Sequence, residues 1–360
     1  MRAWQCCEHG EQVLHEAGIT AGPAWARLRF QQGSLYWQEG NYEEALDVTE
    51  QALRLFEEGI PEVPTPENPS HMTRTKRTLL GDPVDLGRTH ALLGALTNAV
   101  GQRKEALKHL NTALALYEHH DRQREIAHVC CNIGHVHLKK AEYSLAQSFL
   151  RRSLHLAERI GDVPLMSVVF HNQGELAAST GNLTEAETSY RRSLNLAERV
   201  NDREYLSLWN ADLAAVLQEQ GKLEETRTYV HRALTIGRAI NNVPCIGNAL
   251  VALGNLHIAQ AKAVSQGQTV GGEEKRTPAT KYFLMRARNS LERALALHGL
   301  EAETRTRGQL ALAQVSLLSG ELETARQQAT QAMEEARRYE LAALLAHCQR
   351  LLGEVLDFCP

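Results

Sequence analysis

The chain has 360 residues, of which 43% are hydrophobic and 23% charged, and its formal net charge is −4. A weakly acidic chain lacks the basic surface that attracts phosphate backbones, so we expect no direct binding of nucleic acid. No apolar run approaches the length of about 18 residues that spans a bilayer, and the N-terminus has no signal-peptide layout, so we expect no membrane association. The seven cysteines are odd in number and lack disulfide or metal spacing, which predicts a reducing, cytoplasmic location.

The chain repeats itself every 40 residues. One set of small residues recurs at this interval: Gly94, Gly134, Gly174, Ala214 and Gly254. A second set follows twelve residues after the first: Ala106, Ala146, Ala186 and Thr226. Small residues at fixed offsets mark close helix contacts, because a larger side chain would push the helices apart. We therefore expect leucine at Gly174 to destabilise the fold and alanine to be tolerated there, since Ala214 and Ala313 occupy equivalent positions.

Within one repeat, the residue order resembles the tetratricopeptide repeat, in which two antiparallel helices carry small and aromatic residues at fixed places. Near the N-terminus these positions are Gly33, Tyr36, Gly40, Tyr42, Ala45 and Ala52. The resemblance implies an all-α fold, a right-handed superhelical α-solenoid of antiparallel helix pairs. The unit is 40 residues long rather than the common length of about 34. In this respect it is similar to the sensor arms of MalT-like regulators and of signal-transduction ATPases.

The repeat pattern predicts seven segments in chain order. Residues 1–23 form a half repeat or an N-terminal cap, 24–57 a first repeat, and 58–84 a proline-rich inserted loop. Regular repeats occupy 85–260, a second inserted loop 261–281, further repeats 282–340, and a capping helix 341–360. The two insertions are expected at the surface, because their prolines or glycines do not sustain a helix.

Short oxygen-bearing residues precede the predicted first helices of four repeats: Asp121, Asp162, Asp202 and Asn242. Such side chains accept hydrogen bonds from the free amides of a helix start, so we expect them to be helix caps. Asn182 and Glu185 have the spacing of a capping box at the start of a second helix.

No sequence motif for nucleotide binding or nucleophilic catalysis is present, so we expect a protein that is not an enzyme and has no cofactor. His171 and Glu175, together with His128, His135 and His137, suggest a metal-dependent hydrolase as an alternative. Adjacent cysteines on a helix point about 100° apart, so Cys130 and Cys131 are expected in the core. Lys139 and Lys140 are expected on a solvated face.

The resemblance also implies a ligand site, because the first helix of each tetratricopeptide repeat lines the concave surface. Carried onto this sequence, the groove residues are His128, Cys131, Asn132, His135, His171, Asn172, Glu175, Asp212, Asn248 and Asn255. Basic residues for capturing a peptide carboxylate are few, Arg88 and Lys139. A polar face without a specific ligand remains the alternative.

Together these features predict a non-catalytic scaffold that binds a protein or peptide segment in its groove. We expect the sensor or interaction arm of a bacterial signalling or transcription regulator. The alternative is a free-standing, peptide-responsive regulator that sequesters a partner protein.

Overall fold

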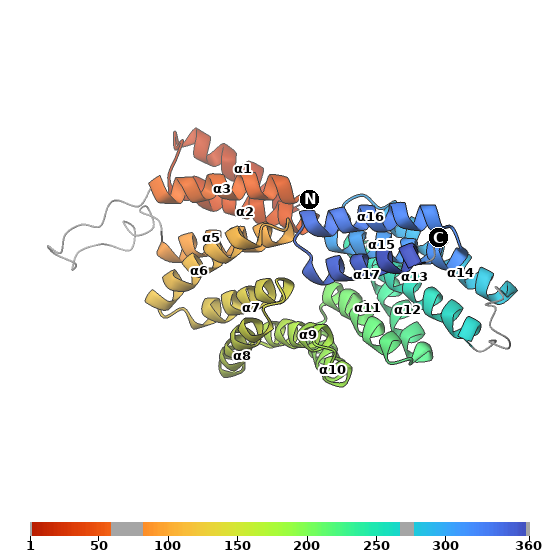
Figure 1. Ribbon diagram of the computed structural model, residues 1–360. Helices are drawn as coiled ribbons and strands as arrows, with labels where there is room; N and C mark the ends of the chain where they lie inside the picture. Colours follow the sequence, from red (N-terminus) through yellow and green to blue (C-terminus); the bar gives the residue numbers. More distant parts are fainter. Residues whose placement is uncertain (1, 59–81, 267–276, 358–360) are drawn as a thin grey trace. The chain divides into compact units, whose positions relative to one another are not determined.

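The computed structural model describes residues 2–58, 82–266 and 277–357, and every secondary-structure element in these ranges is an α-helix (Figure 1). The first helices along the chain are α1 (Arg2–Glu16), α2 (Pro23–Glu39), α3 (Tyr42–Glu58), α5 (Pro83–Ala99), α6 (Arg103–His119) and α7 (Gln123–Lys139). They are followed by α8 (Tyr143–Ile160), α9 (Val163–Ser179), α10 (Leu183–Val200), α11 (Arg203–Glu219) and α12 (Leu223–Ala239). The last are α13 (Val243–Gln266), α14 (Pro278–Leu295), α15 (Ala302–Ser319), α16 (Leu322–Arg338) and α17 (Ala342–Asp357). None of these helices is both long and apolar enough to cross a membrane.

The chain divides into two compact units, Met1–Val136 and His137–Pro360. In the first unit, α2 packs against α1 and α3, and α5 packs against α6, α3 and α2. The second unit continues in the same way from α8 to α17, each helix packing against the next. Alternate helices also touch one another there, as in the pairs α11 with α13, α13 with α15 and α15 with α17. This arrangement confirms the predicted α-solenoid of helix pairs. The first helices of the pairs are α2, α5, α7, α9, α11, α13 and α15, and the second helices are α3, α6, α8, α10, α12, α14 and α16. Helices α1 and α17 flank these pairs.

The small residues of the first helices interlock with the second helices. A Cβ atom on Gly174 would lie 2.7 Å from Cδ1 of Tyr190, and one on Gly94 would lie 2.5 Å from Cγ of Leu110. Such contacts are too short for any real carbon pair, and both Tyr190 and Leu110 are buried. Alanine at Gly174 would therefore require the buried ring of Tyr190 to shift, which opposes the expectation that alanine is tolerated there.

The size of the opposing residue explains why alanine does occur in other repeats. The partner lies sixteen residues after the small residue, which pairs Gly174 with Tyr190. At the same distance, Ala214 is followed by Val230 and Ala313 by Ala329. These partners are smaller than tyrosine or leucine and are fully buried. In these repeats the large tyrosine or leucine is therefore paired with glycine, and the smaller partners are paired with alanine.

Most of the proposed helix caps are present. Asp162 and Asp202 accept hydrogen bonds from the amides of Leu165 and Tyr205, each at 3.1 Å. Asn242 likewise accepts from Cys245 N at 2.9 Å. Asp121 differs, because its φ of 50° places it in the left-handed turn that ends α6. The 40-residue step relates it to Gly161, Asn201 and Asn241, which have the same conformation, rather than to the caps that follow them.

The predicted insertions fall largely outside the described residues, which omit 59–81 and 267–276. Within the described part, α13 continues to Gln266 and so extends beyond the predicted start of the second insertion at residue 261. Ala261 is 1% exposed and belongs to the same apolar cluster as Leu284 of α14. This packing favours continuation of the helix, which the loop prediction missed.

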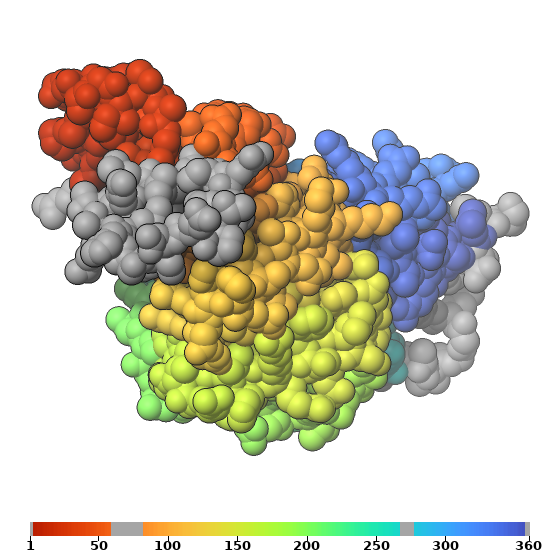
Figure 2. All heavy atoms as spheres, turned by 90° about the vertical axis from the view of Figure 1, so that its left-hand side faces the viewer, coloured from red at the N-terminus to blue at the C-terminus, as the bar shows by residue number. Residues whose placement is uncertain are grey.

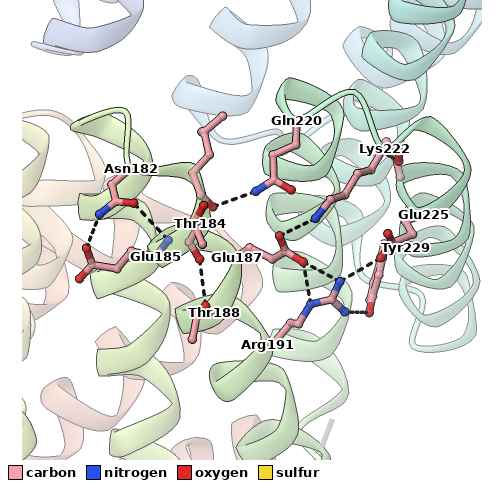
Figure 3. Close-up of polar contacts among 12 residues, drawn as sticks. Asn182, Thr184, Glu185, Glu187, Thr188, Arg191, Gln220, Lys222, Glu225 and Tyr229 are labelled. Carbon is pink, nitrogen blue, oxygen red and sulfur yellow. Dashed lines mark hydrogen bonds and ion pairs between the residues drawn. The ribbon is translucent and has the colours of Figure 1, made fainter.

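The second helices α10 and α12 are joined by a ladder of polar contacts (Figure 3). Arg191 donates to Glu187, Glu225 and Tyr229, with distances between 2.7 and 3.1 Å. Lys222 Nζ lies 2.9 Å from the other oxygen of Glu187. At the start of α10, Asn182 and Glu185 form the predicted capping box.

In Figure 2 the yellow-green atoms of α8 to α10 form one continuous packed surface.

Candidate ligand-binding site

All ten predicted groove residues lie on first helices, on α7, α9, α11 and α13. His128, Cys131, Asn132 and His135 belong to the first compact unit, and the other six belong to the second. The two sets are therefore described separately.

In the first unit, the predicted residues line α7 at different depths. His128 is exposed, and Asn132 and His135 are half-buried. Nδ1 of His135 lies 3.5 Å from Nδ2 of Asn98, near the end of α5. Cys131 is 2% exposed and Cys130 is fully buried, so both cysteines are in the core. Cys131 therefore offers no accessible surface to a ligand.

In the second unit, four of the predicted residues join a polar cluster on the first helices. Nε2 of His171 on α9 donates to Oδ2 of Asp212 on α11 at 3.0 Å. Oδ1 of Asp212 lies 3.8 Å from Nη1 of Arg307 on α15. The same guanidinium donates from Nη2 to the side-chain oxygen of Asn248 on α13. Four first helices thus meet through one set of side chains.

The cluster continues to the last turn of α7. Nζ of Lys139 lies 2.6 Å from Oε1 of Glu175 and 2.9 Å from the carboxylate of Glu303 on α15. The Lys139 side chain is 16% exposed, so the expectation of a solvated face is wrong for this residue. The inner-face cluster, as we call it, therefore consists of Lys139, His171, Glu175, Asp212, Asn248, Glu303 and Arg307.

Two aromatic rings contact the imidazole of His171. The imidazole is stacked on the indole of Trp209, with centroids 5.0 Å apart, and lies 5.2 Å from the ring of Tyr190. Trp209 is in turn stacked on Tyr205 at 4.5 Å. These rings fix the direction of His171 and leave its Nε2 edge facing Asp212. Trp209 and Tyr190 are themselves buried, so they hold the imidazole in place from the core.

The charges within the inner-face cluster stabilise one another. Burial alone would raise the pKa of Asp212, but the hydrogen bond from His171 and the nearby Arg307 and Lys139 lower it below its usual value. For Lys139, burial acts to lower the pKa, and the carboxylates of Glu175 and Glu303 raise it instead. Burial also acts to raise the pKa of Glu303, but the positive charge of Lys139 lowers it below its usual value. These groups are therefore ionised near neutral pH.

The remaining predicted residues are on the same helices. Asn172 on α9 is 6% exposed, and Asn255 on α13 is half-buried. Arg88, the other candidate for carboxylate capture, is in the first unit and pairs with Asp85 at 3.4 Å.

Two residues of the inner-face cluster were missed from the sequence, Glu303 and Arg307. The signal for Arg307 was available, because it lies six residues before Ala313, just as Asn248 lies six before Gly254. Glu303 occupies no position that the repeat rule marks.

The histidines show no metal-site geometry in the part of the chain that the structure describes. No group of three or more histidine, cysteine, aspartate or glutamate side chains could hold a metal ion there. Glu175, which the hydrolase reading paired with His171, is instead bound to Lys139. The cluster therefore consists of hydrogen-bond donors, acceptors and ion pairs.

Comparison with known families supports the repeat assignment. Three family models described as Tetratricopeptide repeat match residues 26–58, 123–199 and 211–243. These matches show that the chain contains tetratricopeptide repeats in these segments. No curated protein matches the sequence.

Several solved structures share the fold at low identity. A Rap protein complexed with Competence and Sporulation Factor matches 96% of this chain and 79% of its own, with a TM-score of 0.58 and 13% identity. The Rap conjugation gene regulator of plasmid pLS20, in complex with the Phr* peptide, matches 76% and 77%, with a TM-score of 0.52 and 17% identity. Aspartyl phosphate phosphatase F from Bacillus subtilis matches 87% and 70%, with a TM-score of 0.56 and 12% identity. At such identities the likeness extends to the fold alone.

Proposed function

We propose that this tetratricopeptide-repeat protein is a non-catalytic scaffold that binds a peptide or protein segment on its first helices. The inner-face cluster carries the proposal. It gathers imidazole, amide, carboxylate and cationic groups from consecutive repeats beside the stacked rings of Trp209 and Tyr205. Amide and imidazole groups both donate and accept hydrogen bonds, which suits them to a peptide backbone.

The fold neighbours support a regulatory role for such a scaffold. Two of them are described in complex with Competence and Sporulation Factor or with the Phr* peptide, and one is described as a conjugation gene regulator. We infer a regulator whose partner contacts change when a segment binds, either as the sensor arm of a signalling or transcription regulator or as a free-standing protein. In both forms the partners are proteins or peptides, and nucleic acid and membranes are not bound directly.

Candidate contact residues lie in each of the two units, and each set is proposed by itself. On α7 the accessible groups are His128, Asn132 and His135. In the second unit the ligand would contact His171, Asp212 and Asn248 together with Lys139. Glu303 and Arg307 are not assigned to the ligand.

A library of random linear peptides, selected on the purified full-length chain, tests the proposal. We expect a set of enriched peptides whose affinity falls about tenfold in His171→Ala, because losing one hydrogen-bonded group of a buried contact costs about 1–2 kcal/mol. Asn132→Ala tests the α7 residues of the first unit by themselves.

The matched control is Arg227→Ala on the second helix α12, where the side chain is exposed. Arg191 is unsuitable as a control, because it joins α10 to α12 through Glu225 and Tyr229. Thermal melts show whether each variant is folded. No enriched peptide, or equal losses in His171→Ala and Arg227→Ala, would contradict the proposed function.

A further inference from the structure

Helix α15 reaches the inner-face cluster from a distant part of the sequence. Glu303 and Arg307 lie one helical turn apart on α15, so their side chains share a face. Glu303 contacts Lys139, which is 164 residues away in the chain. Arg307 contacts Asp212 and Asn248. Two side chains of one helix thus join α7, α11 and α13.

These contacts are incompletely matched. The ammonium group of Lys139 forms ion pairs with two carboxylates, those of Glu175 and Glu303. The nearest approach of Arg307 to Asp212 is 3.8 Å, longer than a hydrogen bond, and the buried Nε atom of Arg307 has no hydrogen-bond partner. Charged groups lose hydration when they are buried, and imperfect pairing recovers only part of that loss. The contacts of α15 therefore leave part of the charge in the cluster unmatched.

The contacts of α15 also use the groups assigned to the ligand. Lys139 and Asn248 cannot offer their full hydrogen-bonding capacity to a peptide while Glu303 and Arg307 occupy it, and the charge of Asp212 faces the Arg307 guanidinium. A segment that binds these groups must replace the α15 side chains or share their partners.

We propose, on the basis of the function proposed above, that Glu303 and Arg307 form an ionic latch that competes with the ligand for the inner face. With the latch closed, α15 is tied to α7, α11 and α13 and the site is self-occupied. When a segment binds, it takes over Lys139, Asp212 and Asn248, and α15 is released from them. Ligand affinity then depends on how often the latch opens in the free protein.

The double variant Glu303→Gln/Arg307→Gln tests the latch in the full-length chain. Both substitutions preserve side-chain hydrogen bonding, and together they leave the net charge unchanged. The matched control is Arg288→Gln, which breaks an ion pair of 2.7 Å with Glu321 between the second helices α14 and α16. Glu303→Gln alone serves as a milder variant if the double variant is unstable.

The first readout needs no ligand. Hydrogen exchange is measured along α15, α11 and α9 at low and high salt. In the native chain we expect exchange in α15 to become faster as salt rises, because salt screens partly exposed ion pairs. The latch variant should exchange fast at low salt and respond little to further salt, whereas Arg288→Gln should behave like the native chain in these helices. Equal exchange in the native chain and the latch variant would overturn the latch.

The second readout is the affinity for peptides selected on the native chain. We expect the latch variant to bind them about 3- to 10-fold more tightly, the factor expected for two partly exposed ion pairs that no longer oppose binding. Arg288→Gln should leave the affinity unchanged. Unchanged or weaker binding by a folded latch variant would overturn the competition even though the protein binds peptides. If no peptide binds either protein, the proposed function fails and the competition fails with it, and the exchange result then reports on the ion pairs alone.

Discussion

Gly174 offers the sharpest test of how the repeats pack. Its Cβ position lies 2.7–3.0 Å from three ring carbons of Tyr190, which is 4% exposed and has little room to move. Gly353 on α17 provides a matched control, because an added Cβ would meet nothing within 4 Å there. Both glycines are inside helices, so their substitution by alanine changes the same backbone preference.

The two substitutions should have opposite signs. Alanine in place of glycine stabilises a helix interior by about 1 kcal/mol. At Gly353 this gain stands alone, so we expect Gly353→Ala to raise the free energy of unfolding by about that amount. At Gly174 overpacking costs about 1–3 kcal/mol, so Gly174→Ala should be neutral to destabilising by about 2 kcal/mol. Leucine at Gly174 should cost more, about 2–4 kcal/mol, because it adds further volume to a filled contact.

A double-mutant cycle identifies the cause. Valine at position 190 imitates the repeat in which Val230 lies opposite Ala214. In the Tyr190→Val background Gly174→Ala should become stabilising, because the ring it would touch is gone. The assay is urea unfolding of each full-length variant with unchanged m value. If Gly174→Ala has the same effect with Tyr190 and with valine, or matches Gly353→Ala, the packing argument is refuted.

Three further predictions concern charges and rings. Burial and the neighbouring His109 lower the pKa of His90 to about 4. The unfolded chain therefore binds this proton first, and the free energy of unfolding falls as the pH falls from 6.5 toward 4. His90→Gln should reduce the slope of the unfolding free energy in that window by about 1.4 kcal/mol per pH unit, and an unchanged slope would contradict this. Lys222, with Arg191, lowers the pKa of Glu187 to about 2. The ionised Glu187 therefore contributes fully to the free energy of unfolding above about pH 4.5, and this contribution is lost as the pH falls toward 2. Glu187→Gln should lower the free energy of unfolding by about 1 kcal/mol at neutral pH, and the difference from the native chain should shrink in acid. His171→Ala should change the emission of Trp209, on which the imidazole is stacked, whereas Arg227→Ala should not.

The sequence was sufficient for the repeat and its helix pairs, because the small residues recur at a fixed step. It did not show that Tyr190 fills the space at Gly174, since this requires comparing each small residue with the partner sixteen positions later. Asp121 was misassigned because the caps lie one residue beyond the left-handed turn positions, and the two are neighbours in sequence. The first point requires a pair of positions to be compared, and the second requires the register within a single turn.

The candidate site was only partly predictable. His171, Asp212 and Asn248 lie on first helices as expected, and the same positional rule would have found Arg307. The contact of Lys139 with Glu303 depends on how far successive repeats rotate within the second unit, and a 40-residue period does not specify that rotation. For this reason Lys139 was mistaken for a solvated residue.

The most direct test of the central claim is photo-crosslinking of a selected peptide to the native full-length chain. The peptide carries a photoreactive group at each position in turn, and the attachment sites are read by mass spectrometry. The account predicts crosslinks on the inner faces of α9, α11 and α13 around His171, Asp212 and Asn248, which excess unlabelled peptide abolishes. Crosslinks confined to the second helices α10, α12 and α14 would contradict it.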